Sequence, residues 1–336
     1  MLLNAEFASP AGDPLAGLPD LAALKAASDL VRRHMLPTPT LNWPLLDRRI
    51  GAEVWVKHEN HTPIGAFKVR GGLVYLSRLR QARPEVGGVI SATRGNHGQS
   101  LALAGRTVGL SVVIVVPEGN NPEKNAAMVA LGAELVVHGR DFQEAAEHAA
   151  ELAEARHLHM VPPFHPWLVE GVATYGLELF SAHPDLEAVF VPIGMGSGIC
   201  GLITAARALG VEIPIIGVVS QGAPAYHLSF RAGRVIATER AETVADGLAC
   251  RTPSPQALDI IRAGATDVVT VADSSIRAAM AAYVTDTHNL AEGAGAAPLA
   301  ALIEANGLYR GRKVGVVLSG GNVDRILLSE ILAAEE

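Results

Sequence analysis

The sequence contains few cysteines. Only Cys200 and Cys250 occur among 336 residues, so no disulfide framework can hold the fold together, and a small cross-linked domain is excluded. The first residues, MLLNAEFASPAGDPLAG, lack a basic start and contain Asp and Glu, unlike a secretory or transit peptide. We therefore expect a protein of the reducing cytoplasm that is not exported.

An excess of positive charge is also absent. The chain has 27 Lys and Arg against 34 Asp and Glu, a formal net charge of −7, which argues against a surface that coats the phosphates of DNA or RNA. One run of nineteen uncharged residues, between Glu187 and Arg207, is long enough to suggest a membrane span. It is broken by Pro192, Gly194, Gly196, Gly198 and Gly201, a spacing that suits a strand, a turn and a helix start. Neither a nucleic acid nor a membrane is expected as a partner.

What the chain does contain is typical of a large α/β enzyme. Its length exceeds that of one hydrophobic core, and 49% of its residues are hydrophobic. Short runs rich in Val and Ile predict buried strands at Ala52–Val56, Gly88–Ser91, Val112–Val116, Glu134–Val137, Val189–Ile193, Pro214–Val219, Val268–Val271 and Lys313–Leu318. Helical stretches separate them at Leu21–His34, Asn96–Val108, Glu123–Leu131, Gln143–Ala155, Cys200–Leu209, Ser274–Thr285 and Ala297–Ala305.

This alternation of strands and helices predicts an α/β fold of parallel sheets with crossover helices. Eight strands leave a (β/α)₈ barrel open, but their unequal spacing and the long insertions favour doubly wound sheets. We find no internal repeat, charge block or low-complexity tract. The proline-rich stretch Val161–Pro166 is the best candidate for an internal linker.

A lysine after a glycine turn is the first candidate for chemistry. The segment Lys57–Gly71 reads KHENHTPIGAFKVRG, and it places Lys68 between Phe67 and Arg70. A neighbouring cation and an apolar wall are expected to lower the pKa of the Lys68 amine, as a Schiff-base lysine requires. The alternative is a surface lysine at the start of a helix.

Two further segments follow predicted strands. Ser91–Gln99, SATRGNHGQ, opens a helix whose free backbone N–H groups face a small anion such as a carboxylate, although Asn96 and His97, taken alone, would be ordinary turn or capping residues. Val317–Asn322, VLSGGN, places Ser319 at the carboxyl edge of a buried strand, where ligands of open α/β sheets gather. Taken alone, Ser319 would be a turn residue.

A glycine loop completes the set. Val191–Gly201, VPIGMGSGICG, follows a strand and opens a helix, so its unobstructed N–H groups form a cradle for phosphate. Its glycines also satisfy the dinucleotide fingerprint G-x-G-x-x-G. The next strand, however, runs into Ser220 and Gln221 instead of the acidic residue that would hold an adenosine ribose, which counts against NAD.

Other types of site are less favoured. His58 and His61 lack the four-residue spacing of the H-E-x-x-H zinc enzymes, so no metal site is expected. Gly196-Ser197-Gly198 is not a nucleophile elbow, and Cys200 is better explained as a small packing residue.

Together and in this order, the four segments resemble the fold-type II pyridoxal-phosphate (PLP) enzymes, most closely the threonine/serine dehydratase branch that includes serine racemase. The matching motifs are GAFKVRG, SATRGNHGQ, GMGSG and SGGN, with Ala245-Asp-Gly247 as a further glycine segment. The resemblance covers nearly the whole chain. It implies a two-lobed, tryptophan synthase β-like architecture, with a small domain of residues 61–163 inserted into a large PLP-binding domain of residues 1–60 and 164–336, the active site lying between them.

The resemblance also implies a role for each residue. Lys68 would form the internal aldimine with pyridoxal 5′-phosphate, Phe67 would pack near the ring, and Asn96 would hydrogen-bond the ring hydroxyl. The phosphate would be bound by Gly194, Met195, Gly196, Ser197 and Gly198, with Gly247 beside the cofactor and Ser319 facing the pyridine nitrogen. The substrate would be bound by Thr93, Arg94, Gly95 and His97. Because a neutral hydroxyl leaves the pyridine nitrogen largely unprotonated, Ser319 favours elimination over chemistry that needs a stronger electron sink.

Several departures from the family pattern concern the substrate. Arg94 stands where threonine dehydratases usually carry Ala and serine racemase carries its second base; it either points to solvent or clamps a carboxylate. Ser220 replaces the family's acidic metal ligand, and Phe164 and Trp167 either line the pocket or pack in the core. The chain stops soon after Asn322, so no carboxyl-terminal regulatory domain is expected.

The sequence therefore predicts a PLP-dependent dehydratase, an ammonia-lyase that converts L-threonine or L-serine to a 2-oxo acid and ammonia, acting as a homodimer. Within the fold, the alternatives are a dehydratase for a bulkier or acidic substrate, such as phenylserine or hydroxyaspartate, and an amino acid racemase. From other classes, an NAD-dependent oxidoreductase and a catalytically silent homologue remain.

Overall fold

Two parallel-rich β-sheets organise the chain in the computed structural model, which describes residues 14–334. The larger sheet has the order β1-β2-β10-β7-β8-β9, and the smaller has the order β5-β4-β3-β6. The strands are β1 Thr40–Asn42, β2 Glu53–His58, β3 Gly88–Ala92, β4 Ser111–Val116, β5 Glu134–Val137, β6 His159–Met160, β7 Ala188–Pro192, β8 Ile215–Ser220, β9 Asp267–Val271 and β10 Lys313–Leu318. Among the strands of the described residues, only β1 pairs antiparallel with its neighbour.

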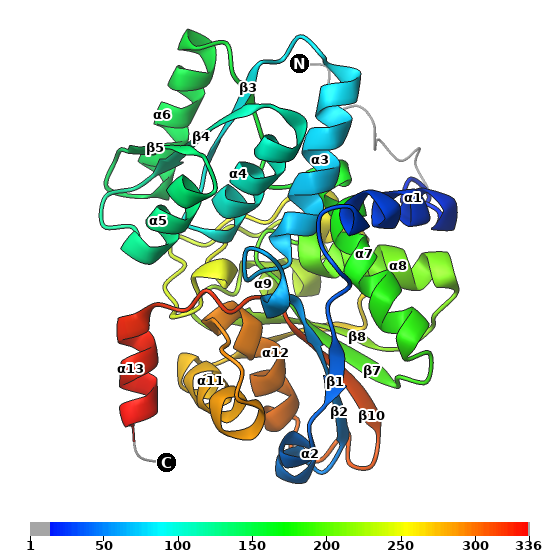
Figure 1. Cartoon of the computed structure of the whole chain (residues 1–336). Helices are drawn as coiled ribbons and strands as arrows, with labels where there is room; N and C mark the ends of the chain where they lie inside the picture. The colour runs from blue at the N-terminus through cyan, green and yellow to red at the C-terminus, as the bar shows by residue number, and fades with distance from the viewer. Residues whose placement is uncertain (1–13, 335–336) are drawn as a thin grey trace.

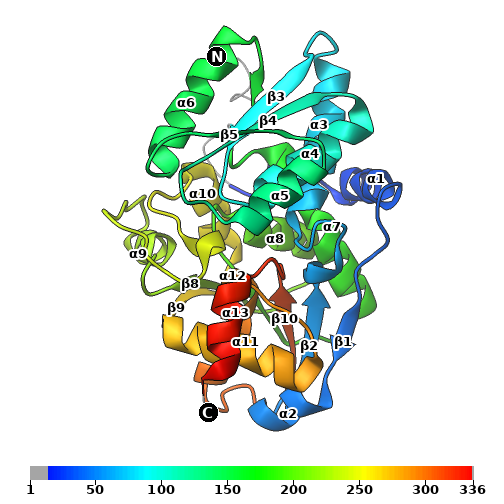
Figure 2. The same cartoon turned by 60° about the vertical axis from the view of Figure 1, so that its left-hand side comes forward.

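The helices of the described chain follow most of the strands, as crossover connections require. They are α1 Leu21–Arg32, α2 Pro44–Ile50, α3 Lys68–Ala82, α4 Asn96–Val108, α5 Pro122–Ala130, α6 Phe142–Ala155, α7 Pro166–Ala182, α8 Ser197–Leu209, α9 Ala225–Ala232, α10 Pro255–Gly264, α11 Asp273–Thr287, α12 Gly293–Glu304 and α13 Arg325–Ala333, with short 3₁₀ helices η1 Glu59–His61 and η2 Asp246–Leu248. Figure 1 shows the smaller sheet with α4, α5 and α6 in the upper half of the molecule and the larger sheet with α11 and α12 in the lower half; Figure 2 shows the same division from another side.

The predicted α/β class is confirmed, and all eight predicted strands are present. Strands β7 and β8 are buried at every position, which explains their continuous Val and Ile content. The seven predicted helices are also present, although α8 begins at Ser197 instead of Cys200 and α12 at Gly293 instead of Ala297. The uncharged run is divided between β7 and α8, and no helix within residues 14–334 is long and apolar enough to cross a membrane. The leader weighed at residues 1–17 falls mostly outside the described residues.

The topology brings distant loops to one place. Strand β10, the last in the chain, lies between β2 and β7 at the centre of the larger sheet. Its carboxyl end therefore meets the loop after β7 and the segment that leads from β2 into α3. Helix α3 packs against α4, which follows β3 of the smaller sheet, and against α7, so it connects the two sheets.

Candidate active site

The lysine segment is fastened to the end of β10 by backbone hydrogen bonds. Ala66 and Gly320 form an antiparallel bridge, and the Phe67 N–H donates to the Ser319 carbonyl at 3.0 Å. The Gly321 N–H donates to the carbonyl of Gly65, whose φ of +68° favours glycine. These contacts place Lys68, the first residue of α3, beside Ser319, which is only 3% exposed.

The Lys68 amine lies at the centre of this arrangement. Nζ donates to Ser197 Oγ at 2.9 Å and lies 5.0 Å from the centre of the Phe67 ring. Burial lowers the pKa of the amine from its ordinary value of 10.5 to about 8, because a charged ammonium loses solvation there. The expected apolar wall is therefore real. The expected contribution of the Arg70 cation is wrong, because desolvation alone accounts for the shift and Arg70 is ion-paired elsewhere.

This pKa predicts how Lys68 reacts before any cofactor is bound. Only a neutral amine attacks an acylating reagent, so modification of Lys68 in the cofactor-free protein should rise with pH through a midpoint near 8. The labelling of a lysine exposed to water should instead have its midpoint at about pH 10.4. Peptide mass spectrometry after brief labelling at a series of pH values measures the midpoint of Lys68 and those of the exposed lysines. A Lys68 midpoint that matches the other lysines would contradict the desolvated environment.

The glycine loop leaves its backbone accessible. A side chain at Gly194 would meet the Gly247 carbonyl at 2.1 Å, and Gly196 has a φ of +98°, so neither position accepts another residue without strain. Two carbonyls of this loop accept hydrogen bonds from tyrosines: the Tyr226 hydroxyl donates to the Met195 carbonyl, and the Tyr175 hydroxyl donates to the Gly198 carbonyl. Helix α8 begins at Ser197, so the N–H groups of its first turn remain for an anion.

The loop after β3 lies at the start of α4. The Gly95 N–H donates to the buried Thr93 hydroxyl at 3.1 Å, which closes a tight turn. Arg94, at the tip of this turn, is exposed, whereas its neighbours Thr93 and Gly95 are buried. A side chain at Gly95 would collide with Lys124, whose methylene groups cover the turn.

His97 carries an unsatisfied group. Its Nε2 is buried and has no hydrogen-bond partner among residues 14–334. Burial, assisted by the charge of Lys68, lowers the pKa of His97 to about 3, so the imidazole is neutral. A buried, unpaired nitrogen next to the Lys68 amine is a polar atom that a bound ligand or water can satisfy.

Sequence reasoning missed Glu292. Asn96 Nδ2 donates to Glu292 Oε1 at 2.7 Å, and Asn96 Oδ1 accepts from Asn322 Nδ2 at 2.8 Å. Lys124 Nζ lies 3.6 Å from Asp246 Oδ2, and its charge also reaches Glu292. The available signal was a glutamate before Gly-Ala-Gly at the start of an apolar helix, which is indistinguishable from an ordinary first-turn acid.

The remaining predicted residues have structural contacts. Trp167 packs against Tyr75, with 5.7 Å between ring centroids, and Phe164 packs on the core of the larger sheet. The Ser220 hydroxyl donates to Asp273. These contacts support the core-packing alternative for Trp167 and Phe164.

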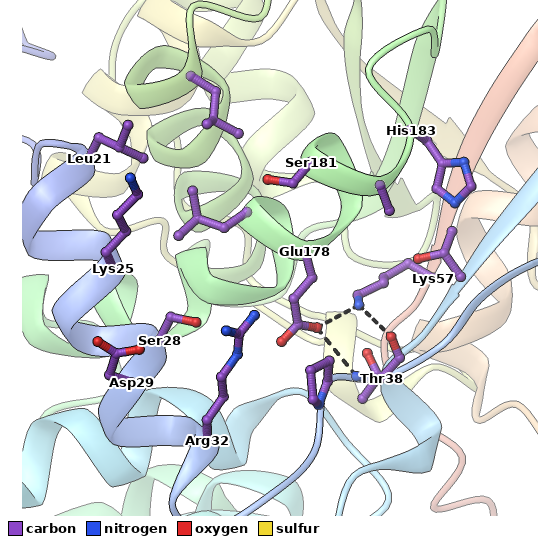
Figure 3. A pocket seen from close by; sticks show the side chains of 15 residues that line it. Leu21, Lys25, Ser28, Asp29, Arg32, Thr38, Lys57, Glu178, Ser181 and His183 are labelled. Atoms are coloured by element: carbon purple, nitrogen blue, oxygen red, sulfur yellow. Dashed lines mark hydrogen bonds and ion pairs between the residues drawn. The ribbon is translucent and has the colours of Figure 1, made fainter.

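A groove of about 650 Å³ lies away from Lys68, between α1 and the carboxyl end of α7 (Figure 3). Lys25 and Arg32 of α1 line one side, and Glu178 lies at its base. Glu178 Oε2 accepts from Lys57 Nζ at 2.6 Å and from the Thr38 N–H at 3.3 Å.

A buried ion network continues from this groove towards Lys68. Arg70 is fully buried and donates to Glu59 and Glu178, each at 2.7 Å, and to the Thr174 hydroxyl at 3.0 Å. Because Arg70 is in the first turn of α3, the network anchors the turn that carries Lys68.

Comparison with known proteins identifies the class. A profile of the family described as "Pyridoxal-phosphate dependent enzyme" matches residues 31–320. The chain is 36% identical over 311 residues to an L-threonine ammonia-lyase of Geobacter sulfurreducens, covering 92% of this chain and 77% of that protein. It is 32% identical over 318 residues to an L-threo-3-hydroxyaspartate ammonia-lyase of Saccharomyces cerevisiae, covering 92% and 95%. The processed threonine deaminase isoform 2 of Solanum lycopersicum superposes with a TM-score of 0.85 at 30% identity, covering 95% of both chains.

A two-sheet α/β fold with a desolvated lysine beside a glycine loop thus defines an enzyme of the fold-type II PLP class. The chain belongs to the family of pyridoxal-phosphate dependent enzymes. The predictions of family, fold, enzyme class and cofactor are confirmed, as is the predicted ammonia-lyase reaction class at the level of these relatives. The residues present fit the cofactor: the glycine loop offers a cradle for its phosphate, and His97 Nε2 awaits a polar partner.

Proposed function

We propose that this protein eliminates water from an L-β-hydroxy amino acid, after which the unsaturated amine takes up one water and releases ammonia, with L-threonine or L-serine as substrate and a 2-oxo acid as product. The observation that carries the proposal is the Lys68 amine, desolvated and placed between the glycine loop and the end of β10. The relatives named as ammonia-lyases support the reaction class.

Each group of residues has a part in this reaction. Bound PLP would withdraw electrons from the substrate's α-carbon and make its proton acidic. Lys68 would hold the cofactor covalently, and its free amine would accept the proton from the α-carbon of the substrate. The amides of Gly194, Met195, Gly196, Ser197 and Gly198 would hold the phosphate, and Gly247 lies against Gly194.

The other proposed contacts orient the substrate and the ring. Thr93, Gly95 and His97 would bind the substrate carboxylate at the start of α4, with the exposed Arg94 at the rim. Phe67 would pack against the ring, and the buried Ser319 would face its nitrogen as a neutral partner, which favours elimination. The carboxylate oxygens would find N–H groups there because this helix start has no side-chain cap.

The substrate is tested by a panel of L- and D-β-hydroxy amino acids, scored for 2-oxo acid and ammonia. We expect L-threonine or L-serine to show the highest kcat/KM, with release of one ammonia per 2-oxo acid. A preference for L-threo-3-hydroxyaspartate would instead assign Arg94 and Lys124 to a second carboxylate. Interconversion of L- and D-serine without ammonia would contradict the proposal and favour a racemase.

The organisation beyond the site is also proposed. Residues 61–163, which contain the four strands of the smaller sheet, form the small domain, and residues 1–60 and 164–336 form the large domain; residues 1–13 and 335–336 lie outside the described part. A homodimer in the cytoplasm follows from the family resemblance, and the two free cysteines, Cys200 and Cys250, suit a reducing compartment. Sedimentation equilibrium of the holoenzyme tests the dimer.

A further inference from the structure

The Asn96 amide lies in a chain of hydrogen bonds that begins at the backbone. Asn322 Nδ2 donates to the Ile64 carbonyl at 2.8 Å, next to the lysine turn, and to Asn96 Oδ1 at the same distance. Asn96 Nδ2 then donates to Glu292 Oε1 at 2.7 Å. The Asn96 side chain therefore joins the start of α4 to two segments far away in sequence, those that contain Glu292 and Asn322.

This chain allows only one orientation of the Asn96 amide. The backbone carbonyl of Ile64 only accepts, so it turns the NH₂ of Asn322 towards itself and towards Asn96. Asn96 must then present its oxygen to Asn322 and its nitrogen to Glu292, whose carboxylate accepts only. One of the two hydrogens on Asn96 Nδ2 is used by Glu292, and the other is available to a ligand.

Glu292 is held firmly enough to enforce this orientation. It is 8% exposed and immediately precedes α12, where its own N–H donates to the Gly320 carbonyl at 3.0 Å. Its Oε1 lies so close to Gly320 that a side chain there would approach it to 2.4 Å. Burial raises the pKa of the Glu292 carboxyl above its ordinary value, and the cation of Lys124 and the Asn96 N–H, which both favour the ionised form, oppose this rise.

We propose that Glu292 and Asn322 are positioning residues that lock the Asn96 amide with its free N–H facing the cofactor's ring hydroxyl. This inference rests on the proposed function, in which Asn96 contacts that hydroxyl. With the lock in place, the ring oxygen meets a hydrogen-bond donor. Without it, the amide can turn and present its own oxygen, which repels the ring oxygen. Neither Glu292 nor Asn322 needs to touch the substrate.

The test replaces Glu292 by glutamine, which keeps the volume but can donate as well as accept. E292Q is expected to weaken the binding of pyridoxal phosphate by about 5- to 20-fold, the loss of one hydrogen bond, and to shift the visible absorption of the bound cofactor. Binding is measured by titrating cofactor-depleted full-length protein. Glu170→Gln is the matched control, because Glu170 is a buried glutamate that pairs with Arg78 outside the site; its affinity and spectrum should equal those of the wild type.

A double-mutant cycle separates positioning from a general structural role. If Glu292 acts through Asn96, adding E292Q to the N96A variant should cause no further loss of affinity for pyridoxal phosphate. An equal loss in both backgrounds, or wild-type affinity and spectrum in both E292Q and N322A, would overturn the inference. Should E292Q not fold, N322A carries the same test with the same expected losses. Failure of the proposed function is distinct: the wild type would then bind no cofactor at Lys68, or bind it without releasing ammonia from any β-hydroxy amino acid.

Discussion

Replacing Lys68 by alanine is expected to lower the release of 2-oxo acid from L-threonine or L-serine by more than about 10³-fold. The reason is that, in the proposed reaction, one amine performs two tasks: it holds the cofactor, and it takes the proton from the α-carbon. No other amine is placed to do this in the described chain, because Lys57 is bound to Glu178 and Thr38 and Lys124 faces Asp246. Turnover is measured at saturating cofactor.

The control for this variant is Lys25→Ala, which removes an exposed lysine from α1 at the groove. It should leave turnover at the wild-type rate, since the Lys25 side chain is exposed and lines the groove away from Lys68. The absorbance of bound cofactor provides a second readout, because the K68A protein should lose the band of the covalently held form. Turnover in K68A within a few-fold of the control would refute the role of the amine.

Replacing Arg70 by methionine is expected to destabilise the protein by about 3–5 kcal/mol, the usual cost of removing one partner from a buried ion pair. Arg70 is fully buried between Glu59 and Glu178, so its loss leaves two carboxylates in the core with a single cation, Lys57. Burial alone would raise the pKa of Glu178, yet the hydrogen bonds and charges of Arg70 and Lys57 hold it below its ordinary value. Urea unfolding at saturating cofactor measures the loss.

The control for this variant is Arg156→Met, which breaks an exposed pair with Glu134. An exposed pair of this kind contributes about 0–1 kcal/mol, so the urea midpoint should hardly move. Equal shifts of the urea midpoint in the two variants would show that the buried Arg70 network stabilises the fold no more than an exposed ion pair does. Because Arg70 anchors the first turn of α3, R70M should also raise the KM for the cofactor-dependent reaction more than R156M does.

Strands were easier to predict than helices, for a physical reason. A strand buried on both faces, such as β7, is recognisable in the sequence as a continuous apolar run rich in β-branched residues. Helix α3 was not predicted because Gly71 and Gly72 have low helix propensity and Arg70 interrupts its apolar pattern, although all three are buried against α7 or α4. Strands β1 and β6 are too short to form a pattern.

The motif segments of the site could be predicted, but their cross-connections could not. The positions of Lys68, the glycine loop and Ser319 followed from the loops that leave predicted strands. The partners of Asn96 come from residues 292 and 322, and no local pattern links them to position 96. Arg70 shows the same limit: its closeness to Lys68 in sequence suggested an electrostatic effect, whereas its charge is used by Glu59 and Glu178.

One measurement tests the central claim most directly. The holoenzyme is treated with borohydride, which makes a lysine-bound cofactor permanent, and its peptides are then analysed by mass spectrometry. The account predicts a single pyridoxyl adduct, on the peptide that contains Lys68. An adduct on Lys57 or Lys124, or a protein that retains no cofactor after reduction, would contradict it.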